Sequence, residues 1–223
     1  MDENGTTPAL GASNLVAMTT THTPDSALAT LVEGARRAQA GLPRRDHTTV
    51  DERTALAQGQ SPYAAVVGCS DSRVPMEYAF DAGYGDLFAI RTAGHVLGES
   101  VLGTIEFAVA ELKVPLVLVL GHTSCGAVTA ASRTLDTGEV PGAHLTSLVE
   151  RILPSVIASN RSGGTTINQA VAEHTRRTVA QLRDLSPLLK DAETAGRLRI
   201  LGAVYDLGTG AVTVLDQPAS PTT

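Results

Sequence analysis

The sequence predicts an α/β fold in which helices cover both faces of a central parallel β-sheet. Short segments rich in Val, Leu, Ile and Ala alternate along the chain with longer segments of helical periodicity. Strands that alternate with helices pair in parallel, and strands buried on both faces are apolar throughout. The last apolar segment follows Gly208-Thr209-Gly210, which indicates a hairpin that returns along the preceding strand.

The expected elements begin with helices at the N-terminus. Pro24-Asp25-Ser26 starts a helix that runs to about Ala40 and stops at Gly41, and residues 49–58 form a short second helix. The expected strands are 64–68, 87–91, 116–120, 198–205 and 211–215. The helices expected between them are 101–112, 127–135, 143–159 and 166–185.

The composition is that of an ordinary globular domain, with 43% hydrophobic and 18% charged residues in 223. Aromatic residues make up only 3% and Trp is absent, so aliphatic side chains must fill the core. The net charge of −6 and the lack of a Lys/Arg run argue against a nucleic-acid partner. No apolar stretch approaches the roughly 18 residues of a membrane span, so no membrane partner is expected.

The two ends of the chain bear on domain organisation and location. Residues 1–23 lack periodicity and are expected to be a disordered tail, within which Met18 is an alternative start. Residues 24–218 are expected to form a single domain. The first basic residue is Arg36, so the charged start of a signal peptide is missing and we expect a cytoplasmic protein. Two cysteines in that compartment are expected as ligands or buried thiols in preference to the alternative, a Cys69–Cys125 disulfide.

Two short segments contain both cysteines and most of the chemical information. They are Cys69-Ser70-Asp71-Ser72-Arg73 and Gly121-His122-Thr123-Ser124-Cys125-Gly126, and each follows an expected strand. In open α/β sheets, ligands bind beyond the carboxyl ends of the strands, so both segments are expected at one rim of the sheet. Cys, His and carboxylate ligands together are typical of zinc. The sequence therefore predicts a metal site with an acid and a base beside it.

Each candidate also has a structural interpretation. A single Cys at the end of a strand is commonly a buried apolar residue. Cys125, however, lies three residues after His122 in a tight turn, and the helix that follows should favour its thiolate. Asp71 and Arg73 are either a surface ion pair of little value or a pair beside the metal. In the second case Asp71 is a fourth ligand, or it is held by the Arg73 fork and accepts a hydrogen bond from metal-bound hydroxide.

The paired motifs resemble those of the β-class carbonic anhydrases, and the similarity extends from about residue 26 to residue 216. Other matching segments are Asp86-Leu87-Phe88-Ala89-Ile90-Arg91-Thr92-Ala93-Gly94, residues 100–112 and Val204-Tyr205-Asp206-Leu207. The resemblance implies one Zn²⁺ per chain on Cys69, His122 and Cys125. It also implies that Asp71 and Arg73 form the catalytic dyad, with Asp71 on the metal only in a closed form.

The implied activity is the reversible hydration of carbon dioxide to bicarbonate and a proton by zinc-bound hydroxide. The resemblance further implies a sheet extended by a C-terminal strand, an N-terminal helical arm (24–58) that crosses a partner subunit, and a homodimer or tetramer. Carbon dioxide needs a small pocket without charged groups, which residues near Gly126 and Val96 are expected to supply.

Three departures from the family pattern bear on the site. The arm carries Gly34-Ala35-Arg36-Arg37-Ala38 where Gly-Asn-x-Arg-Phe is common. The loop Thr92-Ala93-Gly94-His95 adds His95, a candidate for contact with the reaction. Arg91 and Tyr205 match two residues of a regulatory bicarbonate site, but its Trp position holds Val66. Two further histidines, His144 and His174, fall on helical patterns and are expected to be exposed.

Two other classes of function remain open from the sequence. One is a catalytically silent protein of the same fold that holds zinc or senses bicarbonate, against which the intact Asp71 and Arg73 argue. A related enzyme would hydrolyse another small heterocumulene such as carbon disulfide in the same pocket. The other class is a nucleotide-binding α/β domain, and the lack of Gly-x-Gly-x-x-Gly or a phosphate loop argues against it.

Overall fold

The structure is a computed structural model that describes residues 22–44 and 49–215. The expected tail lies outside this range apart from His22 and Thr23, and so does the end of the expected domain, 216–218. Thr23 caps the first helix, because its side chain accepts a hydrogen bond from the Ser26 amide at 3.2 Å. The ring of His22 lies 5.2 Å from that of Tyr63. His22 and Thr23 therefore both belong with the folded chain.

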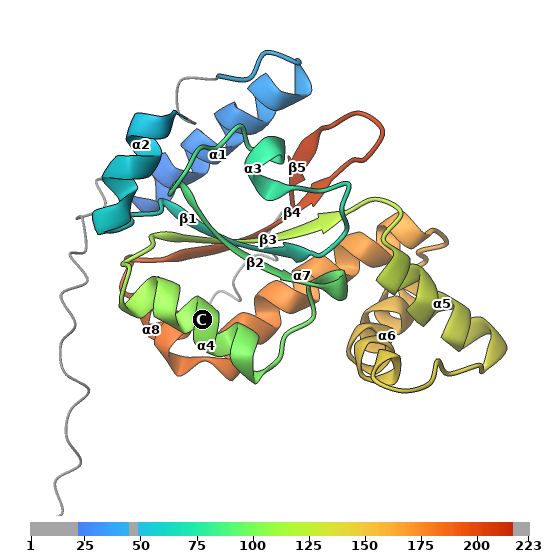
Figure 1. Ribbon diagram of the computed structural model, residues 1–223. Coiled ribbons are helices and arrows are strands. Elements are labelled where there is room, and N and C mark those ends of the chain that lie inside the picture. Colours follow the sequence, from blue (N-terminus) through green and yellow to red (C-terminus); the bar gives the residue numbers. More distant parts are fainter. Residues whose placement is uncertain (1–21, 45–48, 216–223) are drawn as a thin grey trace, which may run out of the picture.

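A five-stranded sheet forms the centre of the molecule, in the order β2-β1-β3-β4-β5 (Figure 1). The strands are β1 (Ala64–Cys69), β2 (Leu87–Thr92), β3 (Leu116–His122), β4 (Arg199–Tyr205) and β5 (Val212–Val214). The first four are parallel and β5 pairs antiparallel with β4. The predicted parallel sheet, extended by a C-terminal strand, is confirmed.

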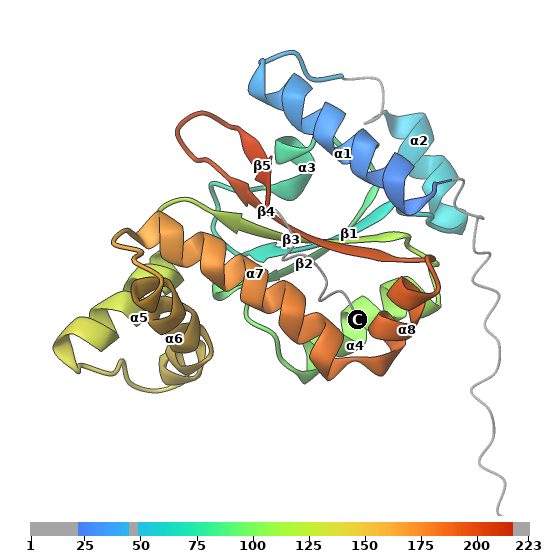
Figure 2. The same cartoon turned by 180° about the vertical axis from the view of Figure 1, so that it is seen from behind.

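Eight α-helices and two short 3₁₀ helices (η) surround this sheet in the described part of the chain. The helices are α1 (Pro24–Gln39), α2 (Val50–Ala55), α3 (Met76–Ala79), α4 (Glu99–Ala110), α5 (Gly126–Thr137), α6 (Leu145–Arg161), α7 (Ile167–Leu185), α8 (Pro187–Thr194), η1 (Leu56–Gln58) and η2 (Ala93–His95). Helices α1 and α3 cover one face of the sheet, and α4, α7 and α8 cover the other (Figures 1 and 2). Helices α5 and α6 pack together at the end of the sheet where β3 finishes (Figure 1).

Burial explains why these segments form strands. All residues of β1 and of β3 are buried, as their continuous apolar sequences predict for strands covered on both faces. The edge strand β2 is only partly buried, with Ile90 as its one buried residue. A third apolar cluster lies at the rim, where side chains of α5, α6 and α7 pack with Cys69 at the end of β1 and with Cys125 after β3. This cluster positions the site.

One expectation about the helices is wrong. His144 is exposed as expected, but His174 is buried, with 3% of its surface accessible. It belongs to the buried stripe of α7, between Val171 and Thr178, and contacts Ser155 of α6, so helix packing and not residue polarity decides its position. No helix among residues 22–44 and 49–215 is long and apolar enough to cross a membrane.

Candidate metal centre

The two sequence motifs meet at the carboxyl rim of the sheet. Cys69 is the last residue of β1, His122 is the last residue of β3, and these two strands are neighbours. Cys125 caps the N-terminus of α5, three residues beyond β3. One donor atom of each residue, the two sulfurs and an imidazole nitrogen, lies within 4.8 Å of the others, and all three residues are buried. Parallel pairing of β1 and β3 therefore assembles a Cys–His–Cys cluster.

The tautomer of His122 presents a free lone pair to this cluster. Its Nδ1 lies 3.0 Å from the carbonyl oxygen of Thr123, which can only accept, so Nδ1 carries the proton. Nε2 is then an acceptor, and within the described ranges it is the buried side-chain nitrogen or oxygen without a hydrogen-bond partner. Leaving a buried polar atom unpaired costs about 1–3 kcal/mol. A metal ion bound to Nε2 removes that cost.

The two thiols share a proton. A hydrogen bond with Cys125 lowers the pKa of Cys69 to about 4, and the amide of Gly94, 3.3 Å from the Cys69 sulfur, acts in the same direction. The same bond, together with burial, raises the pKa of Cys125. The amides at the start of α5 do favour the Cys125 thiolate as expected, but the Cys69 thiolate outweighs them. A divalent cation would displace the shared proton, because metal ligation requires both sulfurs as thiolates.

The charges of the cluster also affect the pKa of His122. Burial acts to lower its pKa, but the neighbouring Cys69 thiolate, the Thr123 carbonyl and the Asp71 carboxylate raise it overall. The site therefore attracts positive charge. A divalent cation would satisfy that attraction, because Zn²⁺ accepts two thiolates and a neutral imidazole at once.

Asp71 lies beside the cluster and is held by hydrogen bonds from Arg73. Its Oδ1 accepts from the Arg73 amide at 3.0 Å and from Nε at 2.9 Å, and its Oδ2 accepts from Nη2 at 2.7 Å. These bonds hold the pKa of the Asp71 carboxyl well below its usual range. The same Oδ2 lies 3.8 Å from Nε2 of His122. The carboxylate is thus ionised, fixed by the fork and directed at the Cys–His–Cys cluster.

The structure gives Arg91 a contact that the sequence did not suggest. Its Nε donates to the carbonyl of Cys69 at 3.0 Å and its Nη2 donates to the carbonyl of Asp71 at 2.7 Å. Arg91 on β2 thereby holds the loop that carries Asp71. Tyr205, its expected partner in a bicarbonate site, is on β4, and β1 and β3 lie between the two strands. Val66 is fully buried in β1.

The two expected pocket residues both lie near the cluster. Val96 is 8% exposed and shares the apolar rim cluster with Cys69 and Cys125. Gly126 opens α5 and is exposed, and a Cβ atom added there would meet no atom within 4 Å. His95 is buried, and its ring stacks on that of His174.

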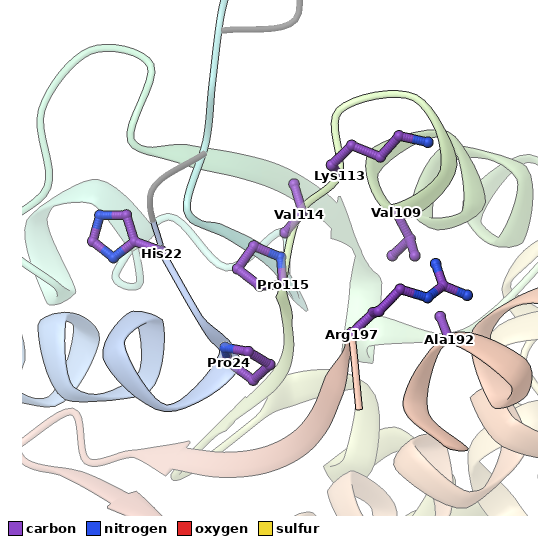
Figure 3. A pocket seen from close by; sticks show the side chains of 8 residues that line it. All are labelled: His22, Pro24, Val109, Lys113, Val114, Pro115, Ala192 and Arg197. Atoms are coloured by element: carbon purple, nitrogen blue, oxygen red, sulfur yellow. The ribbon is translucent and has the colours of Figure 1, made fainter. Parts of the chain in front are cut away.

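A cavity lies elsewhere. It has a volume of about 300 Å³, and Figure 3 shows Val109, Lys113, Pro115 and Arg197 among its lining. Pro115 directly precedes β3 and Arg197 lies two residues before β4, so this cavity is at the amino ends of the strands. It holds none of the predicted site residues and lies at the opposite edge of the sheet from the Cys–His–Cys cluster.

The molecule is thus an α/β protein with a buried Cys–His–Cys cluster, whose donors suit a transition metal, at the rim of its sheet. Comparison with known proteins agrees. The sequence profile of the carbonic anhydrase family matches residues 64–212. Carbonic anhydrase 2 of Mycobacterium tuberculosis is 44% identical over 193 residues, which cover 86% of this chain and 93% of that protein. A carbonic anhydrase of Pseudomonas aeruginosa is 32% identical over 72% of this chain and 76% of its own.

Solved structures are similar as well. The β-carbonic anhydrase CcaA has a TM-score of 0.66 at 25% identity, covering 87% of this chain and 93% of its own. The β-carbonic anhydrase CafA of Aspergillus fumigatus has a TM-score of 0.65 at 27% identity, covering 86% and 90%. The chain belongs to the carbonic anhydrase family and, within it, to the β class.

Proposed function

We propose that this enzyme hydrates carbon dioxide reversibly to bicarbonate and a proton, with Zn²⁺ held by Cys69, His122 and Cys125. The observation that carries the proposal is the buried, unpaired Nε2 of His122, which faces two cysteine sulfurs with an ionised carboxylate 3.8 Å away. Two thiolates and one imidazole are a common zinc ligand set, and three protein ligands leave a fourth position for a reactant. Bound there, zinc would supply Lewis acidity that lowers the pKa of a water ligand to about 7, a value known from carbonic anhydrases themselves.

In this proposal, Asp71 orients the nucleophile. Because its pKa is held far below neutrality by Arg73, it can only accept hydrogen bonds. Oδ1 already accepts two bonds from Arg73, whereas Oδ2 accepts one and keeps a lone pair on the cluster side. Oδ2 would accept the O–H of the nucleophile and so direct the oxygen lone pair at carbon dioxide. The Arg73 fork would also keep Asp71 from becoming a fourth ligand, the closed form in which it blocks the reactant.

Carbon dioxide would bind on the apolar side of the cluster. Val96 offers an uncharged wall and Gly126 leaves space beside Cys125. A linear molecule without charge gains nothing from a polar pocket, and the charged product bicarbonate is disfavoured there. The pocket would therefore bind the substrate and release the product.

The held carboxylate supports an enzyme over a silent zinc or bicarbonate-sensing protein, since a sensor has no need of an oriented acceptor at the open position. The decisive experiment combines zinc content with stopped-flow carbon dioxide hydration. We expect one zinc per chain and a rate that climbs from mild acid to alkaline pH. Asp71→Asn should keep zinc but lose most of the rate, because an amide can donate where an acceptor is needed. A flat pH profile, or full activity in Asp71→Asn, would contradict the proposal, and a parallel assay with carbon disulfide tests the heterocumulene alternative.

We also propose that residues 24–218 form one domain that assembles into a homodimer or tetramer through the helical arm (24–58). Helix α2 buries none of its residues, and its first residue, Val50, is 63% exposed. Leu42, which follows α1, is 73% exposed. Apolar side chains exposed on one segment are typical of an interface. A β-carbonic anhydrase of Sordaria macrospora described as tetrameric has a TM-score of 0.65 at 25% identity, covering 82% of this chain and 94% of its own. Light scattering on wild type and Val50→Asp tests this, and a monomeric wild type would contradict it.

The cytoplasm is the location we propose for the enzyme. Cys69 and Cys125 are free thiols, and both must stay reduced to bind zinc. A reducing compartment provides that condition. Fractionation of cells that express the chain tests this proposal.

A further inference from the structure

A pair of buried histidines lies behind the metal centre and takes no part in the chemistry described so far. The rings of His95 and His174 are stacked, with centroids 4.5 Å apart and planes 16° apart. They come from η2 and α7, and both are almost fully buried. Two buried imidazoles in contact need a reason, because burial of polar rings is costly unless their nitrogens are hydrogen bonded.

The partners of His174 determine its tautomer. Nε2 lies 2.9 Å from the carbonyl oxygen of Gly94, so Nε2 carries the proton and donates. Nδ1 lies 2.9 Å from the hydroxyl of Ser155 on α6, which therefore donates to it. Burial lowers the pKa of His174, in agreement with a neutral ring that has one donor and one acceptor.

Gly94 is held at both of its ends. Its carbonyl accepts from His174, and its amide donates to the sulfur of Cys69 at 3.3 Å. Gly94 and His95 both have positive φ, of 62° and 44°, which is unfavourable for a residue with a side chain such as His95. A Cβ atom on Gly94 would approach Ile152 Cδ1 to 2.8 Å. This turn is strained and tightly packed, so it keeps its shape only because its surroundings hold it.

We propose that His174, oriented by Ser155, is a positioning residue for the metal centre: it holds Gly94 so that the Gly94 amide remains hydrogen bonded to the Cys69 sulfur. The proposal rests on the zinc site described above. An N–H bond to a metal thiolate draws charge from the sulfur, so the sulfur donates less to zinc and the metal is a stronger Lewis acid. Partners behind the ligands of a metal commonly change affinity by about 10- to 100-fold.

The test compares three variants of the full chain. His174→Leu removes the donor to Gly94, His174→Gln keeps an N–H donor near the same place, and Ser155→Ala removes only the partner of Nδ1. His144→Leu is the matched control, because His144 is exposed. Zinc affinity is measured by chelator competition. The thiolate charge-transfer band is measured after replacement of zinc by cobalt.

We expect His174→Leu to lower zinc affinity about 10- to 100-fold and to shift the charge-transfer band. Ser155→Ala should act in the same direction but less, and His174→Gln should restore most of both properties. His144→Leu should match wild type. If His174→Leu only lowers the melting temperature and leaves affinity and band unchanged, the histidine has a structural role alone and the proposal is wrong.

A second measurement does not depend on a variant that folds. In ¹⁵N NMR spectra of the wild-type protein, His174 should be neutral with its proton on Nε2, with or without zinc. A proton on Nδ1, or a charged ring at neutral pH, would overturn the proposal. Failure of the proposed function is distinguishable, because it would appear as a wild-type protein that binds no zinc or hydrates no carbon dioxide while the tautomer is as expected.

Discussion

Single neighbours fix the state of three groups at the candidate metal centre. Thr123 determines the tautomer of His122, Cys69 holds the proton of Cys125 in place, and Arg73 keeps Asp71 ionised. These are short-range contacts between residues close to one another at the rim of the sheet, so single substitutions should separate metal binding from catalysis.

Cys125→Ser should abolish zinc retention. A serine hydroxyl is a hard, protonated donor at neutral pH, whereas zinc prefers thiolate and imidazole. The loss of affinity should exceed the roughly 10- to 100-fold typical of an outer partner. Elemental analysis after gel filtration measures it, and stoichiometric zinc with full activity in the variant would show that the ligand assignment is wrong.

Arg73→Ala should leave the fold and zinc content intact but reduce carbon dioxide hydration by about 100-fold or more, because a freed Asp71 can move onto the metal and a misplaced group costs that much. Arg73→Lys should recover part of the rate, since it restores charge without the fork. Arg133→Ala is the control: Arg133 pairs with Glu139 at 3.1 Å, and both side chains are more than 70% exposed. Stopped-flow rates decide, and near-normal hydration by Arg73→Ala would contradict the dyad.

Helix α1 shows how an element at the N-terminus is fixed to the sheet domain. Its Arg37 donates from Nε to the buried carboxylate of Asp81 at 2.6 Å, and the Arg44 amide donates to the same oxygen at 3.1 Å. One turn earlier, Gly34 lies directly against the carbonyl of Phe80. Gly34 and Arg37 thus make the contact between α1 and the residues after α3. Both belong to the segment of the arm that departs from the family pattern.

Gly34→Ala should destabilise the protein, although alanine is the better helix former. An added Cβ would overlap the Phe80 carbonyl oxygen, and overpacking costs about 1–3 kcal/mol. Gly103→Ala in α4 is the matched control, because a Cβ there meets nothing within 4 Å. It should stabilise by about 0.5–1 kcal/mol through helix propensity. Urea unfolding measures both, and equal effects of the two variants would contradict the packing argument.

For the molecule as a whole, the buried histidines link stability to pH. Burial lowers the pKa of both His95 and His174, so both remain neutral in the folded state. In the unfolded state each binds a proton below about pH 6.5. The unfolded chain therefore binds more protons in mild acid, and stability rises with pH there. His122 acts in the opposite direction in metal-free protein, because its pKa is raised and its contribution is lost as pH rises.

Comparison of wild type with His174→Gln isolates one of these groups. Glutamine does not titrate, so the stability advantage of wild type should shrink as pH falls below about 6.5, with a slope approaching about 1.4 kcal/mol per pH unit. Denaturant unfolding of both proteins in mild acid and at neutral pH measures the difference. A constant or growing advantage in acid would mean that His174 is protonated in the folded protein.

Much of this molecule follows from local sequence. The continuous apolar runs of β1 and β3 predict buried parallel strands, and the carboxyl ends of such strands predict that Cys69 and His122 share one rim. Helices α3 and α8 are not among the expected elements. The Ser186-Pro187 start of α8 is a usable signal, since Ser186 caps the helix through the Leu189 amide at 3.3 Å.

The reactive groups and their location follow from the sequence alone: two cysteines, a histidine, a carboxylate and an arginine at strand ends of an α/β sheet. How these groups are held is visible only in the folded molecule. Arg91 reaches across to the loop after β1, and His174 reaches Gly94 although 80 residues separate them. Periodicity predicts which face of a helix is buried but not what packs against it. A polar residue such as His174 is therefore predicted to be exposed until its hydrogen-bond partners are known. Contacts between distant segments depend on the packing of whole elements, which no local pattern records.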